Sequence, residues 1–260
     1  MKLLTAGCGI SQYSFRYWPT WVKYPAITHD LEHINIGGPA SGNEFLAHNI
    51  IKNLQNTEYK CAIIMWTSHS KTDLYIESQN IIDEIKTYDT RNFVLNDKGL
   101  PIDTAPAWWP SSVSGDNRIK DWINDNIFSD QYQLDKTLIC ISAVQRALEH
   151  NGINYHMFLG YDIPLHSANN YGIDLTKFVT QESLYDNYYS SDWAKYSTTK
   201  EYGLVPVAGW HWDFYKKYIY RILNEYFQIK NIDLNELTKA VSKITEKNFA
   251  EGISLSLIHI

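Results

Sequence analysis

KLLTAGCG, residues 2–9, is an apolar run that stops at two closely spaced glycines. Such a run, ended by a tight turn, is typical of a parallel strand buried on both faces. The pattern returns in INIGGP at 34–39 and in CAIIMWTSHS at 61–70. Helix-like spacing at 18–24 and 41–54 separates these runs. Strands alternating with helices in this way predict a parallel sheet covered by helices on both faces.

Regular patterns return after a long irregular stretch. Residues 71–130 are rich in Asp, Asn, Ser, Pro and Trp with weak periodicity, which predicts an insertion or lid carrying short elements, including a helix near 119–128. Beyond it we expect a helix over 134–151, a strand over 153–159, and two closing helices. These closing helices span 211–228 and 233–248.

The pattern as a whole predicts the α/β class. We expect one domain over residues 1–251, an αβα sandwich of flavodoxin-like type with a central parallel sheet and a long irregular insertion. The last residues, 252–260, follow a polar helix and fit either an added edge strand or a frayed tail.

Composition and charge exclude several function classes. The 260 residues carry a formal net charge of −6 and show no Lys/Arg stripe, which argues against nucleic-acid binding. No apolar run approaches the roughly 18 residues that a membrane helix needs. Aromatic residues reach 14% and fit either a core with its rim or a site for a flat ligand such as a carbohydrate.

The spacing of the cysteines and histidines argues against a metal or redox centre. Cys8, Cys61 and Cys140 lack ligand spacing, and no pair of histidines shows the helical spacing of a metal site. The apolar stretch at the N-terminus is too short for a secretion signal, and an odd cysteine count suits a reducing compartment. The sequence therefore predicts a cytoplasmic protein without a metal or cofactor.

Polar residues follow the predicted strands. In open α/β sheets, ligands bind where the carboxyl ends of the strands meet their loops. Four such loops carry candidates: 7–11, 37–43, 66–70 and 209–213. A hydroxyl nucleophile needs a histidine base, and the developing oxyanion needs N–H donors. Serine, asparagine and histidine in these loops predict an acyl-transfer centre at one edge of the sheet.

Four blocks resemble the SGNH/GDSL hydrolases, in the order in which that family carries them. They are TAGCGIS at 5–11 with WP at 18–19, INIGGPASGNE at 34–44, IIMWT at 63–67 and GWH at 209–211. The likeness is greatest to a branch common in phages and marine bacteria. It implies an αβα sandwich that hydrolyses esters, often acetyl or acyl groups on sugars, lipids or small molecules.

The resemblance also implies roles for single residues. By position, His211 falls on the general base, and Gly38 and Asn43 fall near the oxyanion-hole contributors. Thr67 and Ser68, at the end of the third block, are expected beside the substrate.

The chain departs from the family at two catalytic positions. Gly9 occupies the nucleophile position, so Ser11 is the expected replacement and Ser14 a more distant one, while Gly9 itself is expected beside the substrate. Ala208 stands where the family has its acid, and Asp213 lies on the other side of the histidine. Loss of the acid alone lowers the rate, whereas loss of both groups usually leaves a site kept for binding.

Structural roles compete with these chemical ones. Ser11 and Asn43 are equally plausible as helix caps, since both residue types are favoured there. His211 also fits a capping or packing role beside Trp210, and His69 fits either a surface loop or a polar group supporting the site.

These residues are compatible with two functions. The first is an ester hydrolase in which Ser11 attacks and His211 is the base, with Trp108, Trp109 and Trp210 shaping a pocket for a small or carbohydrate-linked ester. The alternative is a degenerate domain that binds a carbohydrate or other small ligand in the same cleft. A flavodoxin-like cofactor binder is disfavoured, because no strand is followed by a convincing phosphate-binding run.

Overall fold

The computed structural model describes the parts of the chain that form the sheet, its helices and their nearest loops. These are residues 1–7, 11, 14–15, 18–37, 42–54, 58–71, 73–76, 107–110, 129–181, 183–184 and 208–250. The predicted helix near 119–128 and the tail at 252–260 lie outside them.

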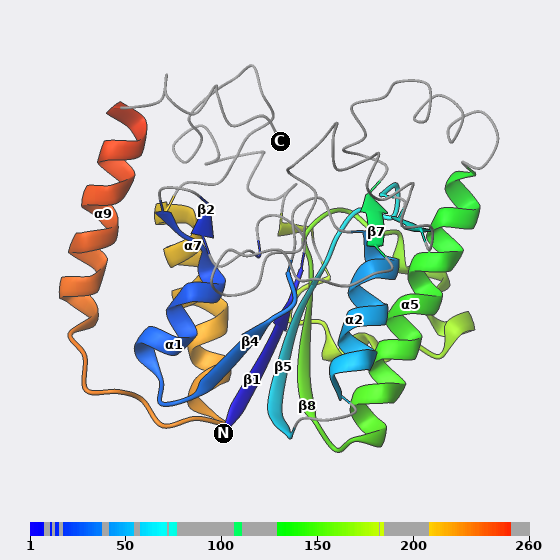
Figure 1. Cartoon of the computed structure of the whole chain (residues 1–260), viewed down its shortest axis with the longest axis horizontal. Coiled ribbons are helices and arrows are strands. Elements are labelled where there is room, and N and C mark those ends of the chain that lie inside the picture. Colours follow the sequence, from blue (N-terminus) through cyan, green and yellow to red (C-terminus); the bar gives the residue numbers. More distant parts are fainter. Residues whose placement is uncertain are drawn as a thin grey trace.

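A parallel sheet forms the centre of the molecule (Figure 1). Among the described residues it has four strands in the order β4-β1-β5-β8, and every neighbouring pair is parallel. The strands are β1 (Lys2–Ala6), β4 (Glu32–Asn35), β5 (Tyr59–Trp66) and β8 (Asn154–Leu159). This order starts as flavodoxin-like sheets do, with the second strand beside the first at the edge. The sequence-based α/β prediction is confirmed, and the carboxyl ends of the strands share one edge.

Helices cover both faces of the sheet (Figure 1). One layer holds α2 (Asn43–Leu54) and α5 (Asp130–His150), and the other holds α1 (Tyr24–Thr28), α7 (Ala208–Phe214) and α9 (Leu234–Ala250). Between α7 and α9 the chain passes through a π-helical turn, η7 (Tyr215–Ile219), and α8 (Tyr220–Asn224). Short 3-10 turns complete the described elements: η2 (Trp21–Lys23), η4 (Leu165–Tyr171) and η5 (Leu175–Lys177).

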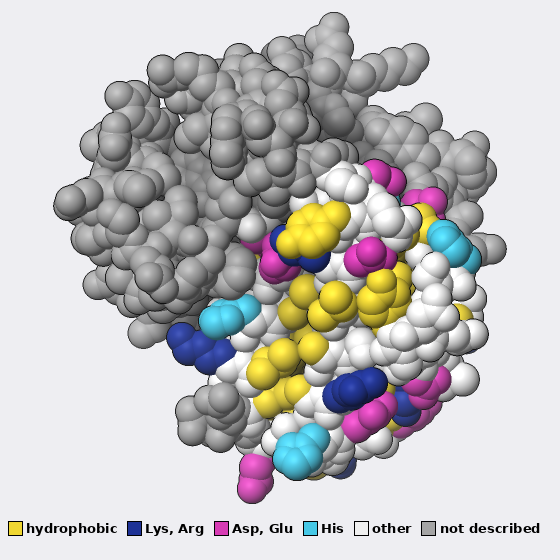
Figure 2. Space-filling view, turned by 90° about the vertical axis from the view of Figure 1, so that its right-hand side faces the viewer, with side chains coloured by type: hydrophobic (Ala, Val, Ile, Leu, Met, Phe, Trp, Pro, Cys, Tyr) yellow, Lys and Arg dark blue, Asp and Glu magenta, His cyan; other side chains and the backbone are white. Residues whose placement is uncertain are grey.

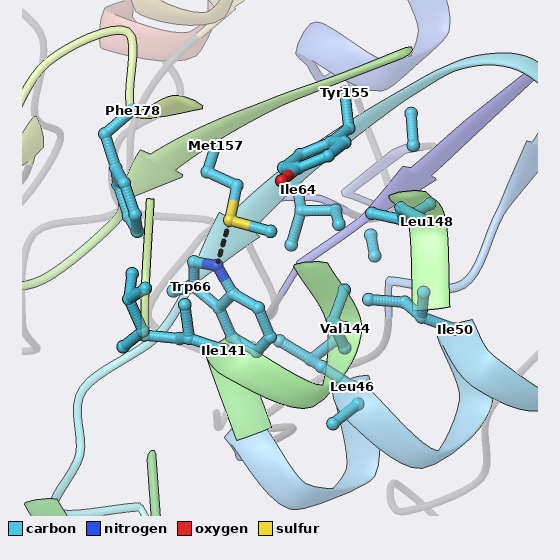
Figure 3. Packing of buried hydrophobic residues seen from close by; sticks show 14 of the residues in the cluster. Leu46, Ile50, Ile64, Trp66, Ile141, Val144, Leu148, Tyr155, Met157 and Phe178 are labelled. Carbon is cyan, nitrogen blue, oxygen red and sulfur yellow. Dashed lines mark hydrogen bonds between the residues drawn. The ribbon is translucent and has the colours of Figure 1, made fainter. Parts of the chain in front are cut away.

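β5 supplies side chains to both layers, because successive strand residues point to opposite faces. Ala62, Ile64 and Trp66 belong to the core under α2 and α5, whereas Ile63 and Met65 belong to the core under α7. Figure 3 shows the first of these cores, where the Trp66 indole donates a hydrogen bond to the Met157 thioether at 3.3 Å. A strand buried on both faces explains why residues 61–66 are continuously apolar.

The second core is largely aromatic. Trp210 stacks on Phe214 with ring centroids 5.5 Å apart, and Trp21 meets Phe214 edge to face at 5.7 Å. All three rings are buried. The aromatic residues of this core therefore serve packing between the sheet and α7.

Three predicted helices differ from the structure. The helix expected over 211–228 begins at Ala208 and continues through η7 and α8 to Asn224. Residues 18–24 do not form one helix: Trp18–Pro19 is β3, paired with β2 (Ser14–Phe15), and Thr20 is extended before η2. Proline suits the first turn of α1 instead, where Pro25 occupies it. α5 begins earlier than predicted, because the Ser129 hydroxyl accepts a hydrogen bond from the Tyr132 amide as an N-cap.

Part of the predicted insertion forms a hairpin. β6 (Asp73–Ile76) pairs antiparallel with β7 (Ala107–Pro110), so the ends of a long connection lie side by side. β6 places Asp73 against the start of α2.

α5 presents a mixed outer surface. Figure 2 shows this side of the molecule, where hydrophobic side chains gather among charged and polar ones. Tyr132 and Ile139 on α5 are 52% and 55% exposed. Within the described part of the chain, no helix is both long enough and apolar enough to cross a membrane.

Candidate functional site

Ser11 is held at the carboxyl ends of β1 and β5. Its side chain is fully buried. The hydroxyl accepts a hydrogen bond from the Trp21 indole at 3.2 Å and donates one to the Met65 thioether at 3.7 Å. Neither partner can take a proton from the hydroxyl at neutral pH, since an indole N–H is a donor only and a thioether is a weak acceptor.

Two glycines make room for Ser11. A β-carbon at Gly7 would lie 2.2 Å from the Ser11 hydroxyl oxygen, and one at Gly37 would lie 2.3 Å from the Ser11 carbonyl oxygen. The Asn35 side-chain amide donates to that same carbonyl at 2.8 Å. The glycines that follow β1 and β4 therefore serve a close backbone approach around Ser11.

Polar side chains of β1 and β4 support this position. The Thr5 hydroxyl donates to Asn35 Oδ1 at 2.8 Å and lies 2.7 Å from His33 Nε2. Because the Thr5 proton goes to Asn35, His33 Nε2 is the donor in the second bond. Burial is the main cause that lowers the pKa of His33 to about 3, with the nearby charge of Lys23 acting in the same direction. His33 is therefore a neutral structural group at the edge of the sheet.

His211 lies within α7 and is fully buried. Its ring meets Trp210 edge to face at 5.0 Å. Burial lowers the pKa of His211 to about 3, so its imidazole is neutral across the physiological range. Asp213, two residues later, forms an ion pair with Lys216 at 3.2 Å.

Ser11 and His211 approach the same aromatic core without a direct hydrogen bond. Among the described residues, the partners of the Ser11 hydroxyl are Trp21 and Met65, and His211 is not one of them. Trp21 in turn packs on Phe214 of α7, three residues beyond His211.

Asn43 connects three elements of the opposite layer. Its amide nitrogen donates to the Thr67 carbonyl at 3.0 Å and to the Thr137 hydroxyl at 3.2 Å, and its oxygen accepts from the Thr67 amide at 3.0 Å. Both amide hydrogens are thereby used inside the protein. Asn43 therefore joins α2, the end of β5 and α5, and its side chain does not cap α2.

Asp73 caps the start of α2 from a distant strand. One carboxylate oxygen accepts from the Gly42 amide and the other from the Phe45 amide, each at 2.8 Å. Burial raises the pKa of the Asp73 carboxyl to about 7, while the two N–H bonds lower it and favour the charged form. Sequence reasoning missed Asp73, since a cap 31 positions away leaves no local pattern.

The loop after β5 lies against the start of α5. Ser68 and Ser70 pair through their hydroxyls at 2.7 Å. His69 Nε2 lies 2.9 Å from the Asp130 carboxylate, with the His69 side chain 15% exposed. The His69 side chain therefore lies mostly inside the protein and connects this loop to the first turn of α5.

The remaining predicted site residues fall into three groups. Gly9 and Gly38 lie outside the described residues, and of Trp108 and Trp109 only the place in β7, opposite Tyr75 and Leu74, is described. Trp210 is 1% exposed and stacked on Phe214, which makes it a core residue in this arrangement.

No metal-binding group of three or more His, Cys, Asp or Glu side chains occurs within the described ranges. The comparisons with known proteins supply no relative: no protein-family model, no curated protein and no solved structure matches the chain.

Proposed function

We propose that this chain is a ligand-binding domain of hydrolase-like architecture, which holds a small neutral ligand such as a carbohydrate at the carboxyl edge of its sheet. The observation that carries the proposal is the setting of Ser11. Its hydroxyl is fully buried and bonded to Trp21 and Met65, neither of which is a base. A serine nucleophile needs a base within about 2.6–3.2 Å.

The oxyanion side of the site supports the same conclusion. An oxyanion hole needs N–H donors that are free to meet the developing charge. Both amide hydrogens of Asn43 already serve Thr67 and Thr137. An Asn43 side chain so engaged contributes to the packing of the edge and has no donor left for an oxyanion.

A serine ester hydrolase is the second candidate. The observation in its favour is the shared aromatic core, because Trp21 contacts both Ser11 and the helix that carries His211. In this mechanism the Ser11 hydroxyl leaves Met65 and gives its proton to His211 as its oxygen bonds to the ester carbonyl carbon. The ester C–O bond then breaks, the alcohol leaves with the proton from His211, and water, activated by the same histidine, releases the acid and restores Ser11.

Ester hydrolysis separates the two candidates. The proposal expects purified protein to hydrolyse p-nitrophenyl acetate and butyrate no faster than the Ser11→Ala and His211→Gln variants do. Wild-type turnover that falls by about a hundredfold or more in both variants establishes the serine esterase and contradicts the binding domain.

Binding is measured in parallel on the wild-type chain. Saturation-transfer NMR with D-glucose, N-acetyl-D-glucosamine and myo-inositol tests for contact with neutral polyhydroxy compounds. The proposal expects at least one of them to receive magnetisation from the protein. If all three fail to do so and no ester is hydrolysed, the proposal is wrong.

A further inference from the structure

Three buried polar atoms near the end of β5 lack hydrogen bonds. Among the described residues, Thr67 Oγ1, His69 Nδ1 and Gln133 Nε2 have no partner. Thr67 is fully buried and Gln133 is 2% exposed. Buried polar atoms without partners are rare and costly, so each calls for a water, an ion or a ligand that meets it.

The contacts around these atoms bring their residues to one place. His69 reaches Asp130 on the first turn of α5, and Asn43 joins Thr67 to Thr137 further along that helix. Gln133 lies between Asp130 and Thr137 at helical spacings of three and four, which places all three on one side of α5. Gln133 therefore lies on the side of α5 whose other residues contact His69 and Asn43.

The chemistry of the three atoms defines what can meet them. His69 Nε2 donates a hydrogen bond to the Asp130 carboxylate, and in the tautomer that carries its proton on Nε2 the other ring nitrogen, Nδ1, is an acceptor. Gln133 Nε2 is a donor, and the Thr67 hydroxyl is both. A group that bonds to all three atoms must both donate and accept hydrogen bonds, as a hydroxyl group does.

The charges nearby exclude an anion as that partner. Asp130 opens α5 and Glu44 opens α2, and Glu44 already holds Lys136 at 2.6 Å. Carboxylates on the first turns of both helices neutralise the helix ends that attract phosphates and carboxylates. A neutral hydroxyl compound meets no such repulsion.

We propose that Thr67, His69 and Gln133 form a subsite that recognises a hydroxyl group of a neutral polyhydroxy ligand, with His69 oriented by Asp130. The inference rests on the proposed binding function and assigns that function a place on the sheet edge. It is distinct from the Ser11 and His211 region, because Gln133 lies on α5, His69 contacts α5, and Thr67 is bonded to Asn43 of α2, whereas His211 lies on α7.

The test compares binding of D-glucose, N-acetyl-D-glucosamine and myo-inositol by the full chain and by three variants in saturation-transfer NMR titrations. Gln133→Leu and Thr67→Val each remove one hydrogen bond to the ligand, and we expect each to weaken binding about fivefold to tenfold. Gln131→Leu is the matched control. It makes the same substitution on the same turn, at an exposed residue whose amide donates to Asp135, and we expect it to leave the affinity unchanged.

The outcomes distinguish this inference from the proposed function. Sugar binding that is equal in wild type, Gln133→Leu and Thr67→Val overturns the subsite and leaves the binding domain in place. If wild type binds neither these two compounds nor N-acetyl-D-glucosamine, both proposals are overturned, and water is then the partner of these atoms. Thermal unfolding of each variant checks that the variant is folded. If Gln133→Leu is unfolded, the result for Thr67→Val, which keeps the side-chain shape, decides the test.

Discussion

Single residues at the sheet edge show how burial sets protonation. His211 is fully buried in an aromatic layer, and burial lowers its pKa to about 3. Asp73 shifts the other way, because burial disfavours its charged form and raises its pKa to about 7. The two groups therefore influence stability in opposite directions as the pH changes.

His211 makes the folded protein sensitive to acid. Its folded pKa lies below the unfolded value near 6.5, so between about pH 6.5 and pH 3 the unfolded state binds more protons and stability falls as the pH falls. In that window we expect the unfolding free energy of the wild type to fall by close to 1.4 kcal/mol per pH unit because of His211, and we expect this decrease to be absent in His211→Phe. Urea unfolding at several pH values measures it. The exposed His166→Ala serves as control, and an unchanged acid profile in His211→Phe contradicts the prediction.

At the scale of elements, helices and strands are connected by side chains from distant segments. The start of α2 is capped by Asp73 of β6, and its first turn is joined to α5 through Asn43 and through the Glu44–Lys136 ion pair. α9, by contrast, is capped locally, because the exposed Asp233 accepts from the Asn235 and Glu236 amides.

The Asp73 cap predicts a local effect on α2. Asp73→Ala leaves the Gly42 and Phe45 amides without their acceptor, so we expect faster hydrogen exchange at both and a loss of about 1–3 kcal/mol in unfolding free energy. Asp233→Ala is expected to cost about 1 kcal/mol and to leave exchange in α2 unchanged. Protected Gly42 and Phe45 amides in Asp73→Ala would show that another group caps the helix.

At the scale of the whole molecule, one sheet separates two cores. Ile63 and Ile64 are neighbours on β5, yet each belongs to a different core. Both are fully buried. The sheet therefore depends on packing from both helix layers.

Truncation on either face of β5 tests this dependence. We expect Ile63→Ala and Ile64→Ala each to lower the unfolding free energy by about 2–5 kcal/mol, since each opens a cavity in a closely packed layer. Ile139→Ala, on the exposed face of α5, is expected to change it by about 0.5 kcal/mol or less. A loss below about 1 kcal/mol for either strand variant would mean that its layer contributes little to the fold, and chemical denaturation measures all three.

Most helices and strands could be predicted from the sequence, because each depends on a pattern of neighbouring residues. The run at 61–66 predicted β5 within two residues, and the spacing of Leu138, Ile141, Val144 and Leu148 predicted α5. Sequence reasoning misjudged residues 18–24, where Pro19 suggested a helix start and the chain instead forms β3 before turning. Apolar periodicity reports which face is buried, and it does not report where a turn delays a helix.

The candidate site was less accessible to sequence reasoning than the fold. Ser11, Asn43 and His211 were singled out by position, and the structure shows the partners of the first two and the burial of the third. Asp73 and Gln133 carried no signal, because a lone Asp or Gln in a polar context fits any surface.

The α/β layers could be predicted from contiguous residues alone, since glycine-ended apolar runs and amphipathic helices are local patterns. Which polar groups meet depends instead on how the layers pack. Asn43 and Thr137 lie 94 positions apart, and Asp73 and Gly42 lie 31 apart. Such hydrogen bonds form when the sheet edge assembles, because packing of the buried layers brings distant loops within bonding distance.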